Sequence, residues 1–191
     1  MTTEKTDILK STNALLTGHF RLTSGLHSST YFQCAKILTY PDITEKICAE
    51  IAVGFKDAGI AKVIAPAIGG IVVGYEMAKA LKAKSVFAER ENGVMTLRRG
   101  FQIEPGERIL IAEDVITTGG SVLEVRDIVE KMGGAPVGFA SLIDRSGGKF
   151  NPGIPYVSWF QMEVKNYNPD DCPMCKEGIP VVKPGSRVFA E

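Results

Sequence analysis

The sequence predicts an α/β fold, with helices on both faces of a mostly parallel sheet and a small additional part at the N-terminus. Short β-branched runs alternate with segments in which apolar residues recur at helical spacing, as in consecutive strand–helix units. In two of these units, glycines lie directly between the strand and the helix. We expect one integrated domain with three parts: an N-terminal helix and a small additional segment over residues 1–40, an α/β core over 41–164 and a turn-rich tail over 165–191.

The N-terminal elements are expected to be a helix, a hairpin and a second helix. Apolar residues on one side of residues 3–17 predict an amphipathic helix. Residues 20–32 alternate at both ends around a Ser-Gly turn, which is typical of a β-hairpin. The second helix begins at Pro41, carries apolar residues at every fourth position and is expected to end at Gly59.

The core is expected to continue as alternating strands and helices. Buried strands are predicted at residues 61–67, 85–88, 108–112 and 136–143. Residues 152–164 are expected to add a strand pair. Helical spacing of apolar residues predicts two helices, at residues 72–81 and 122–132.

The stretch from residue 108 to residue 121 carries most of the chemistry. Glu113 and Asp114 directly follow an apolar run, and Thr117–Ser121 then form a loop of hydroxyls and glycines that begins a helix. Backbone N–H groups at the start of a helix bind phosphate, and glycines let the backbone approach a ligand closely. Carboxylates accept hydrogen bonds from sugar hydroxyls or hold Mg²⁺ through water. The stretch therefore predicts a ligand with a ribose and a phosphate.

These residues resemble the phosphoribosyl-diphosphate (PRPP) signature of type I phosphoribosyltransferases, in which an apolar strand, two acids, two residues and Thr-x-Gly-x-Ser/Thr follow one another. An ordinary strand–helix turn would leave the two acids unexplained. The stretch has no Gly-Lys-Ser/Thr and so is not a Walker A loop. The resemblance implies that PRPP is bound by Glu113, Asp114, Val115, Ile116, Thr117, Thr118, Gly119, Gly120 and Ser121.

A second turn, Gly69-Gly70, lies between another strand and helix. In the resembling family, this loop supplies backbone donors to the pyrophosphate of PRPP. The alternative is an ordinary tight turn between a strand and a helix.

The hairpin region is similar to the N-terminal hood of orotate phosphoribosyltransferases, on the evidence of Phe20, Leu22, Ser24, Gly25, Ser28, Tyr31 and Phe32. Many members of that family have a lysine where this chain has Thr23, and Lys36 or His27 could supply the charge instead. The resemblance implies that orotate is contacted by Thr117, Arg145, Tyr31 and Phe32.

Residues 89–100 form a polar excursion with three arginines, Arg90, Arg98 and Arg99. In the resembling family, a mobile loop at this place closes over the active site of the neighbouring subunit, often with a lysine and a histidine. Neither residue type occurs between Ser85 and Glu107 here. Any of the three arginines could therefore deliver positive charge to the leaving pyrophosphate, with Asp114 as the other catalytic group. The alternative is a solvated hairpin whose arginines have no catalytic role.

The resemblance implies an enzyme that converts orotate and PRPP to orotidine 5′-monophosphate and pyrophosphate in pyrimidine synthesis. It also implies a homodimer, and Mg²⁺ held by the pyrophosphate and ribose of the substrate without an assigned protein ligand. Two alternatives remain open: a phosphoribosyltransferase for another nucleobase, and a non-enzymatic regulator that senses PRPP.

Composition argues against several other classes of partner. The formal net charge is zero, which predicts neither a nucleic acid nor an anionic membrane as a partner. The N-terminus is polar, no apolar run approaches the length of a membrane span, and we expect a cytoplasmic protein.

Four cysteines are too few and too scattered for a disulfide framework. Cys172 and Cys175 form a Cys-x-x-Cys motif that could be half of a zinc site, but no second close pair of cysteines or histidines is apparent. We favour structural or incidental cysteines over a metal or redox role.

Overall fold

The computed structural model describes residues 3–22 and 24–184, so Thr23 lies outside the described residues. Contacts divide the chain into two units. The terminal unit consists of Met1–Lys36 with Val164–Glu191, and the sheet unit consists of Ile37–Glu163. None of the helices in the described part of the chain combines the length and the apolar composition that crossing a membrane requires.

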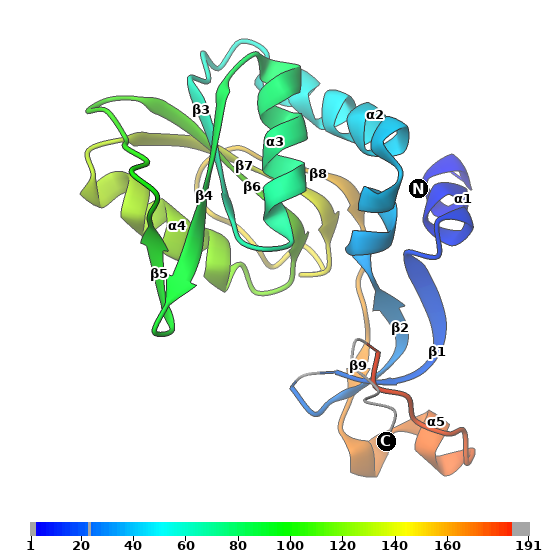
Figure 1. The fold of residues 1–191 in the computed structure, drawn as a ribbon. Helices are drawn as coiled ribbons and strands as arrows, with labels where there is room; N and C mark the ends of the chain where they lie inside the picture. The colour runs from blue at the N-terminus through cyan, green and yellow to red at the C-terminus, as the bar shows by residue number, and fades with distance from the viewer. Residues whose placement is uncertain (1–2, 23, 185–191) are drawn as a thin grey trace, which may run out of the picture. The chain divides into compact units, whose positions relative to one another are not determined.

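The sheet unit is built on six strands in the order β5-β4-β3-β6-β7-β8 (Figure 1). All neighbouring strands are parallel except β5, which is antiparallel to β4 at one edge. The strands are β3 (Lys62–Pro66), β4 (Lys84–Glu91), β5 (Val94–Leu97), β6 (Arg108–Ile116), β7 (Ala135–Asp144) and β8 (Tyr156–Gln161). The predicted mostly parallel sheet is confirmed.

Helices pack on both faces of the sheet because its central strands are apolar on both sides. Ala65 of β3 faces α3 (Gly70–Leu81), where a β-carbon added to Gly74 would lie 2.9 Å from the Ala65 side chain. The next residue on the strand, Ile64, points to the opposite face and joins a buried cluster with three valines of α4 (Gly120–Lys131). The predicted α/β class therefore follows from strands that present apolar side chains alternately to two helical layers.

Strand β6 is longer than the sequence predicts. It continues through the acidic pair because Glu113 pairs with Ser141 of β7 and Ile116 pairs with Asp144. The two acids are therefore held by the sheet and are not part of a loop, which fixes their backbone positions.

Two other ranges in the sheet unit also differ from expectation. Residues 152–164 contribute the single strand β8, parallel to β7, and the predicted strand pair is wrong. Helix α2 (Pro41–Ala52) ends before Gly59, because a 3-10 turn at Val53–Phe55 follows it directly.

The terminal unit joins the two ends of the chain. It contains α1 (Thr3–Ser11), the hairpin of β1 (Leu15–Arg21) and β2 (His27–Phe32), β9 (Asn166–Tyr167) and α5 (Pro173–Lys176). Strand β9 pairs with β2, and the backbone of Val182 bonds to the carbonyl of His19 and the N–H of Arg21, each at 2.8 Å. The C-terminal segment is thus paired along the N-terminal hairpin.

The predicted hairpin is confirmed, but the predicted N-terminal helix is wrong beyond Ser11. Asn13 has a φ of 55°, a left-handed conformation that interrupts a right-handed helix. Leu15 then pairs with Phe32, and Leu16 pairs with Tyr31. Pairing with the second strand of the hairpin thus overrides the helical spacing of these leucines.

Candidate functional site

The two glycine-containing turns of the sheet unit lie together at one edge of the sheet. Strands β3 and β6 are parallel neighbours, so the Gly69-Gly70 turn after β3 lies against the acidic pair of β6. A β-carbon added to Gly69 would lie 2.7 Å from Oδ2 of Asp114, and one added to Gly70 would lie 2.9 Å from Oε1 of Glu113. Glycine is therefore needed at both positions if the carboxyl groups are to stay where they are.

The loop Thr117–Ser121 leads into helix α4. Gly119 is the N-cap residue and has a φ of 81°, which favours glycine. The N–H of Leu123 bonds to the carbonyl of Gly119 at 3.0 Å, so the N–H groups of the residues between them lie in the open first turn. These donors and the positive end of the helix dipole favour an anion at this loop.

A cavity of about 220 Å³ opens at this loop, and we call it the loop cavity. This volume is below the range of about 300–1,000 Å³ for drug-sized ligands, so it suits one end of PRPP better than the whole molecule. The described residues that line it are Arg90, Glu113, Val115, Ile116, Thr117, Thr118, Gly119, Gly120, Ser121, Val122 and Glu124. The structure thus brings most of the predicted PRPP-binding residues of β6 and its loop around one hollow.

Glu113 differs from an ordinary surface carboxylate. Its burial, and then the charge of neighbouring Asp114, raises the pKa of Glu113 to about 9. The N–H of Asp114 donates to Oε1 of Glu113 at 3.1 Å, while Oδ1 of Asp114 accepts from the N–H of Val115 at 2.8 Å. Without a ligand, Glu113 is therefore protonated at neutral pH and can donate a hydrogen bond.

We expect Glu113→Gln to stabilise the ligand-free protein, and increasingly so as the pH rises. The unfolded carboxyl ionises near pH 4.5 and the folded one near pH 9, so wild-type stability falls as pH rises between these values. Glutamine has the shape of the protonated acid and does not titrate. The gain in free energy of unfolding should be on the order of 2–3 kcal/mol at pH 7 and below about 1 kcal/mol at pH 5.

Urea unfolding of both proteins from pH 5 to pH 8 measures this difference. Asp127→Asn, at an exposed position of α4, is the matched control and should show no such trend. A stability difference for Glu113→Gln that stays constant over this pH range would contradict the assigned cause.

The three predicted arginines lie on or next to the hairpin of β4 and β5, so the expected polar excursion is a β-hairpin. Both terminal nitrogens of Arg90 contact the Glu124 carboxylate at 2.9 Å, and both residues line the loop cavity. The described lining does not include Arg98, which pairs with Glu91 at 3.3 Å. Arg99, also outside that lining, pairs with Glu89 at 3.1 Å.

Glu124 is a site residue that the sequence reasoning missed. It lies in the early part of α4, where an acid is unremarkable in a helical pattern. Only the approach of the β4–β5 hairpin to this helix reveals that it holds Arg90 at the cavity.

The residues predicted to contact orotate fall in both units. Thr117 lines the loop cavity. Arg145 is half-buried directly after β7, and its N–H bonds to the carbonyl of Ile116 at 2.8 Å, which places it at the same sheet edge. Tyr31 and Phe32 belong to β2 of the terminal unit, and their contact with orotate stays a prediction.

Comparison with known proteins identifies the family. Residues 39–174 match the phosphoribosyl transferase domain. The chain is 58% identical over 180 residues to the orotate phosphoribosyltransferase of Pelotomaculum thermopropionicum, which covers 94% of this chain and 95% of that protein. It is 54% identical over 184 residues to the orotate phosphoribosyltransferase of Chlorobaculum parvum, with coverage of 96% and 95%.

Solved structures share the fold. The orotate phosphoribosyltransferase of Aeropyrum pernix aligns with a TM-score of 0.69 and 24% identity, over 82% of this chain and 92% of that chain. An adenine phosphoribosyltransferase of Rhodothermus marinus aligns with a TM-score of 0.64 and 23% identity, over 82% and 99%. The fold is therefore common to transferases named for different bases, whereas the two sequence relatives described above are both named orotate phosphoribosyltransferase. These relatives, matched over nearly their full length, show that the chain belongs to the orotate phosphoribosyltransferase family.

Proposed function

We propose that this chain transfers the phosphoribosyl group of PRPP to orotate in the cytoplasm, giving orotidine 5′-monophosphate and pyrophosphate for pyrimidine synthesis. The observation that carries the proposal is the acidic pair of β6, held against Gly69-Gly70 and followed by the loop of α4. This arrangement offers acceptors for ribose hydroxyls beside N–H donors for phosphate. Relatives named orotate phosphoribosyltransferase support orotate as the acceptor base.

Each part of the site has a separate task in the proposed reaction. The N–H groups at the start of α4 hold the 5′-phosphate, and Asp114 accepts hydrogen bonds from the ribose hydroxyls. The bond from ribose C1 to the pyrophosphate oxygen breaks, its electron pair leaves with pyrophosphate, and a ring nitrogen of orotate bonds to C1. Such a step depends on the positioning of the reactants and on positive charge near the leaving group. Arg90 could supply this charge by releasing Glu124 and pairing with pyrophosphate instead.

We include Mg²⁺ in this proposal, because the residues at the sheet edge are suited to binding it. Mg²⁺ takes oxygen ligands and keeps several waters, and the Asp114 carboxylate at this edge of the sheet is an oxygen donor of the kind it prefers. Pyrophosphate and ribose oxygens of PRPP would hold the ion, with Asp114 contacting it through water. When bound, Mg²⁺ neutralises charge on the leaving pyrophosphate.

A panel of bases tests the proposed function. The protein, PRPP and Mg²⁺ are incubated with orotate, uracil or adenine, and release of pyrophosphate is followed. We expect turnover with orotate, and at least about a hundredfold lower kcat/KM with the other bases. Preference for another base would identify that base, and not orotate, as the substrate. PRPP binding without turnover of any base would favour a PRPP-sensing regulator.

Arg145→Ala should lower kcat/KM for orotate by at least about tenfold and leave PRPP affinity nearly unchanged. Orotate differs from uracil by a carboxylate, and a guanidinium binds a carboxylate through two parallel hydrogen bonds. Losing such a contact costs about 1.5–3 kcal/mol, which is about ten- to a hundredfold in kcat/KM.

Steady-state kinetics with orotate and equilibrium binding of PRPP separate the two effects. Arg145→Lys keeps the charge but not the planar fork, so it should restore only part of the activity. Loss of less than threefold in the alanine variant, or an equal loss of PRPP binding, would remove Arg145 from the orotate site.

We propose further that the active form is a homodimer in which Arg98 or Arg99 serves the partner's site. Both side chains are about half exposed, and neither is part of the described lining of the loop cavity in its own chain. An Arg98→Ala/Arg99→Ala chain and an Asp114→Asn chain should each be nearly inactive alone. A purified mixed dimer should regain about half of the wild-type activity, because one of its two sites is then intact. No recovery in proven mixed dimers would contradict the sharing of these arginines.

A further inference from the structure

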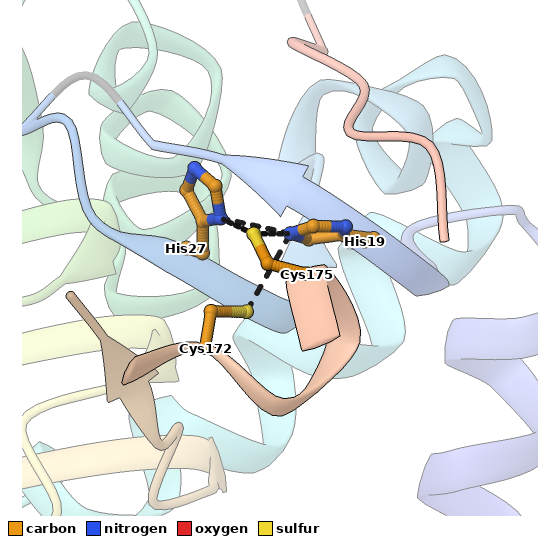
Figure 2. Close-up of side chains that lie close together, drawn as sticks. All are labelled: His19, His27, Cys172 and Cys175. Carbon is orange, nitrogen blue, oxygen red and sulfur yellow. Dashed lines mark hydrogen bonds between the residues drawn. The ribbon is translucent and has the colours of Figure 1, made fainter. Parts of the chain in front are cut away.

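Four side chains with metal-binding atoms converge in the terminal unit (Figure 2). They are His19, His27, Cys172 and Cys175, and their ligand atoms all lie within 4.8 Å of one another. The histidines come from the two strands of the N-terminal hairpin, and the cysteines flank the start of α5. Two strands and a C-terminal turn therefore bring together a pair of imidazoles and a pair of thiols.

The spacing of these atoms is close to that of a tetrahedral site. Zn–S and Zn–N bonds of about 2.3 and 2.05 Å imply S···N distances near 3.6 Å and an N···N distance near 3.3 Å. The sulfur of Cys175 lies 3.7 Å from Nε2 of His19 and 3.3 Å from Nδ1 of His27, and the sulfur of Cys172 lies 3.6 Å from Nε2 of His19. The two ring nitrogens are 2.8 Å apart and would separate by about half an ångström around an ion.

The second nitrogen of His19 orients its ring for such a site. Nδ1 of His19 lies 2.7 Å from the carbonyl oxygen of Ile179, so this nitrogen must carry the hydrogen and donate it. The lone pair is then on Nε2, toward which His27, Cys172 and Cys175 all point. One lone pair can accept one hydrogen bond, whereas a cation among the four groups would satisfy all of them. A metal-binding histidine typically donates its other N–H to a carbonyl or carboxylate in this way.

We propose that His19, His27, Cys172 and Cys175 bind one structural zinc ion. Two thiolates and two imidazoles are a common donor set for zinc, and the two charges of the thiolates balance those of the ion. Four protein ligands leave no open position, so the ion would have no catalytic role. Both cysteines are free, and three of the four ligands are buried, whereas Cys175 is exposed.

The ion would stabilise a unit that has little other core. Among the described residues of the terminal unit, the buried hydrophobic ones are Leu9, Ala14, Phe20, Phe32, Cys34, Cys172 and Met174, which is few for two separate stretches of chain. Small units of this kind often depend on a metal or a disulfide. Zinc would link the C-terminal turn directly to both strands of the hairpin.

Metal analysis of the full-length protein tests this inference. After growth with added zinc and dialysis against metal-free buffer, we expect about one zinc per chain by mass spectrometry of the elements. Cys175→Ser should lose at least about tenfold in zinc content, and the chain should still fold because this side chain is exposed. Cys48→Ala is the matched control: Cys48 is buried in α2, and burial raises the pKa of its thiol to about 12, so zinc should be retained.

Thermal unfolding of the wild-type protein gives a second readout, with Cys175→Ser as its control. A strong chelator should lower the Tm of the wild-type protein by about 5–10 °C if zinc was present at about a hundred times its Kd. The chelator should leave the Tm of Cys175→Ser unchanged. Replacing zinc by Co²⁺ should produce the visible absorption of a tetrahedral cobalt–thiolate site in wild type and not in Cys175→Ser.

Three results would overturn the inference. They are absence of zinc from protein grown with it, equal zinc content in wild type and Cys175→Ser, and a Cys172–Cys175 disulfide in protein purified without reductant. None of these measurements uses the transferase reaction, so they stand apart from the test of the proposed function.

Discussion

Asp114→Asn is expected to lower kcat/KM for PRPP by about 10²–10⁴-fold. In the proposed complex, the carboxylate accepts hydrogen bonds from two ribose hydroxyls, and each charge-assisted bond contributes about 1.5–3 kcal/mol. An amide of the same shape can still accept the 2.8 Å bond from the N–H of Val115, so the fold should be retained. Steady-state kinetics with varied PRPP, together with a thermal unfolding curve, measures both quantities.

Two matched variants distinguish this effect from a general loss of negative charge. Asp127→Asn removes an exposed carboxylate from α4 and should change kcat/KM by less than twofold. Glu113→Gln should cost less activity than Asp114→Asn, because burial and Asp114 keep the Glu113 carboxyl protonated at neutral pH. Wild-type turnover and PRPP binding in Asp114→Asn would refute the role of this residue.

Gly119→Ala should destabilise the protein by about 2–5 kcal/mol. A β-carbon at this position would overlap the ring of Phe150, which is itself packed edge-on against Phe139 and Tyr156 at centroid distances of 5.5 and 5.1 Å. The left-handed φ of 81° adds about 1–2 kcal/mol for any residue with a side chain, and overpacking adds about 1–3 kcal/mol. The Tm should fall by about 5–20 °C, and PRPP affinity should fall with it.

The neighbouring glycine provides the control. A β-carbon at Gly120 would meet Oγ1 of Thr118 at 3.7 Å, an ordinary contact, so Gly120→Ala should leave the Tm within about 2 °C of wild type. In the Gly119→Ala background, Phe150→Leu should recover part of the lost stability, because it removes the overlapping ring atoms. Equal stability of Gly119→Ala and Gly120→Ala would show that Phe150 does not constrain this loop.

Residues adjacent along the chain made the PRPP motif predictable. An apolar run, two acids, a small-residue loop and a helix follow one another without a gap, and each is recognisable from local composition. The alternation of such units was enough to predict a mostly parallel sheet with helices on both faces. Local patterns failed where pairing with another strand decided the outcome, as at Leu15 and Leu16, whose helical spacing predicts a helix but which pair with β2.

The fold class, the family resemblance and the PRPP motif could all be predicted from the sequence alone, because each depends on residues that are close together along the chain. Only the tertiary structure decided that Gly69-Gly70 meets the acidic pair and that Glu124 holds Arg90, because both depend on which strands and helices become neighbours. For the same reason, the sequence did not reveal that two histidines lie beside Cys172 and Cys175. His19 and His27 lie eight residues apart on two strands, and 153 residues separate His19 from Cys172, so only the folded hairpin and tail bring the four ligands together.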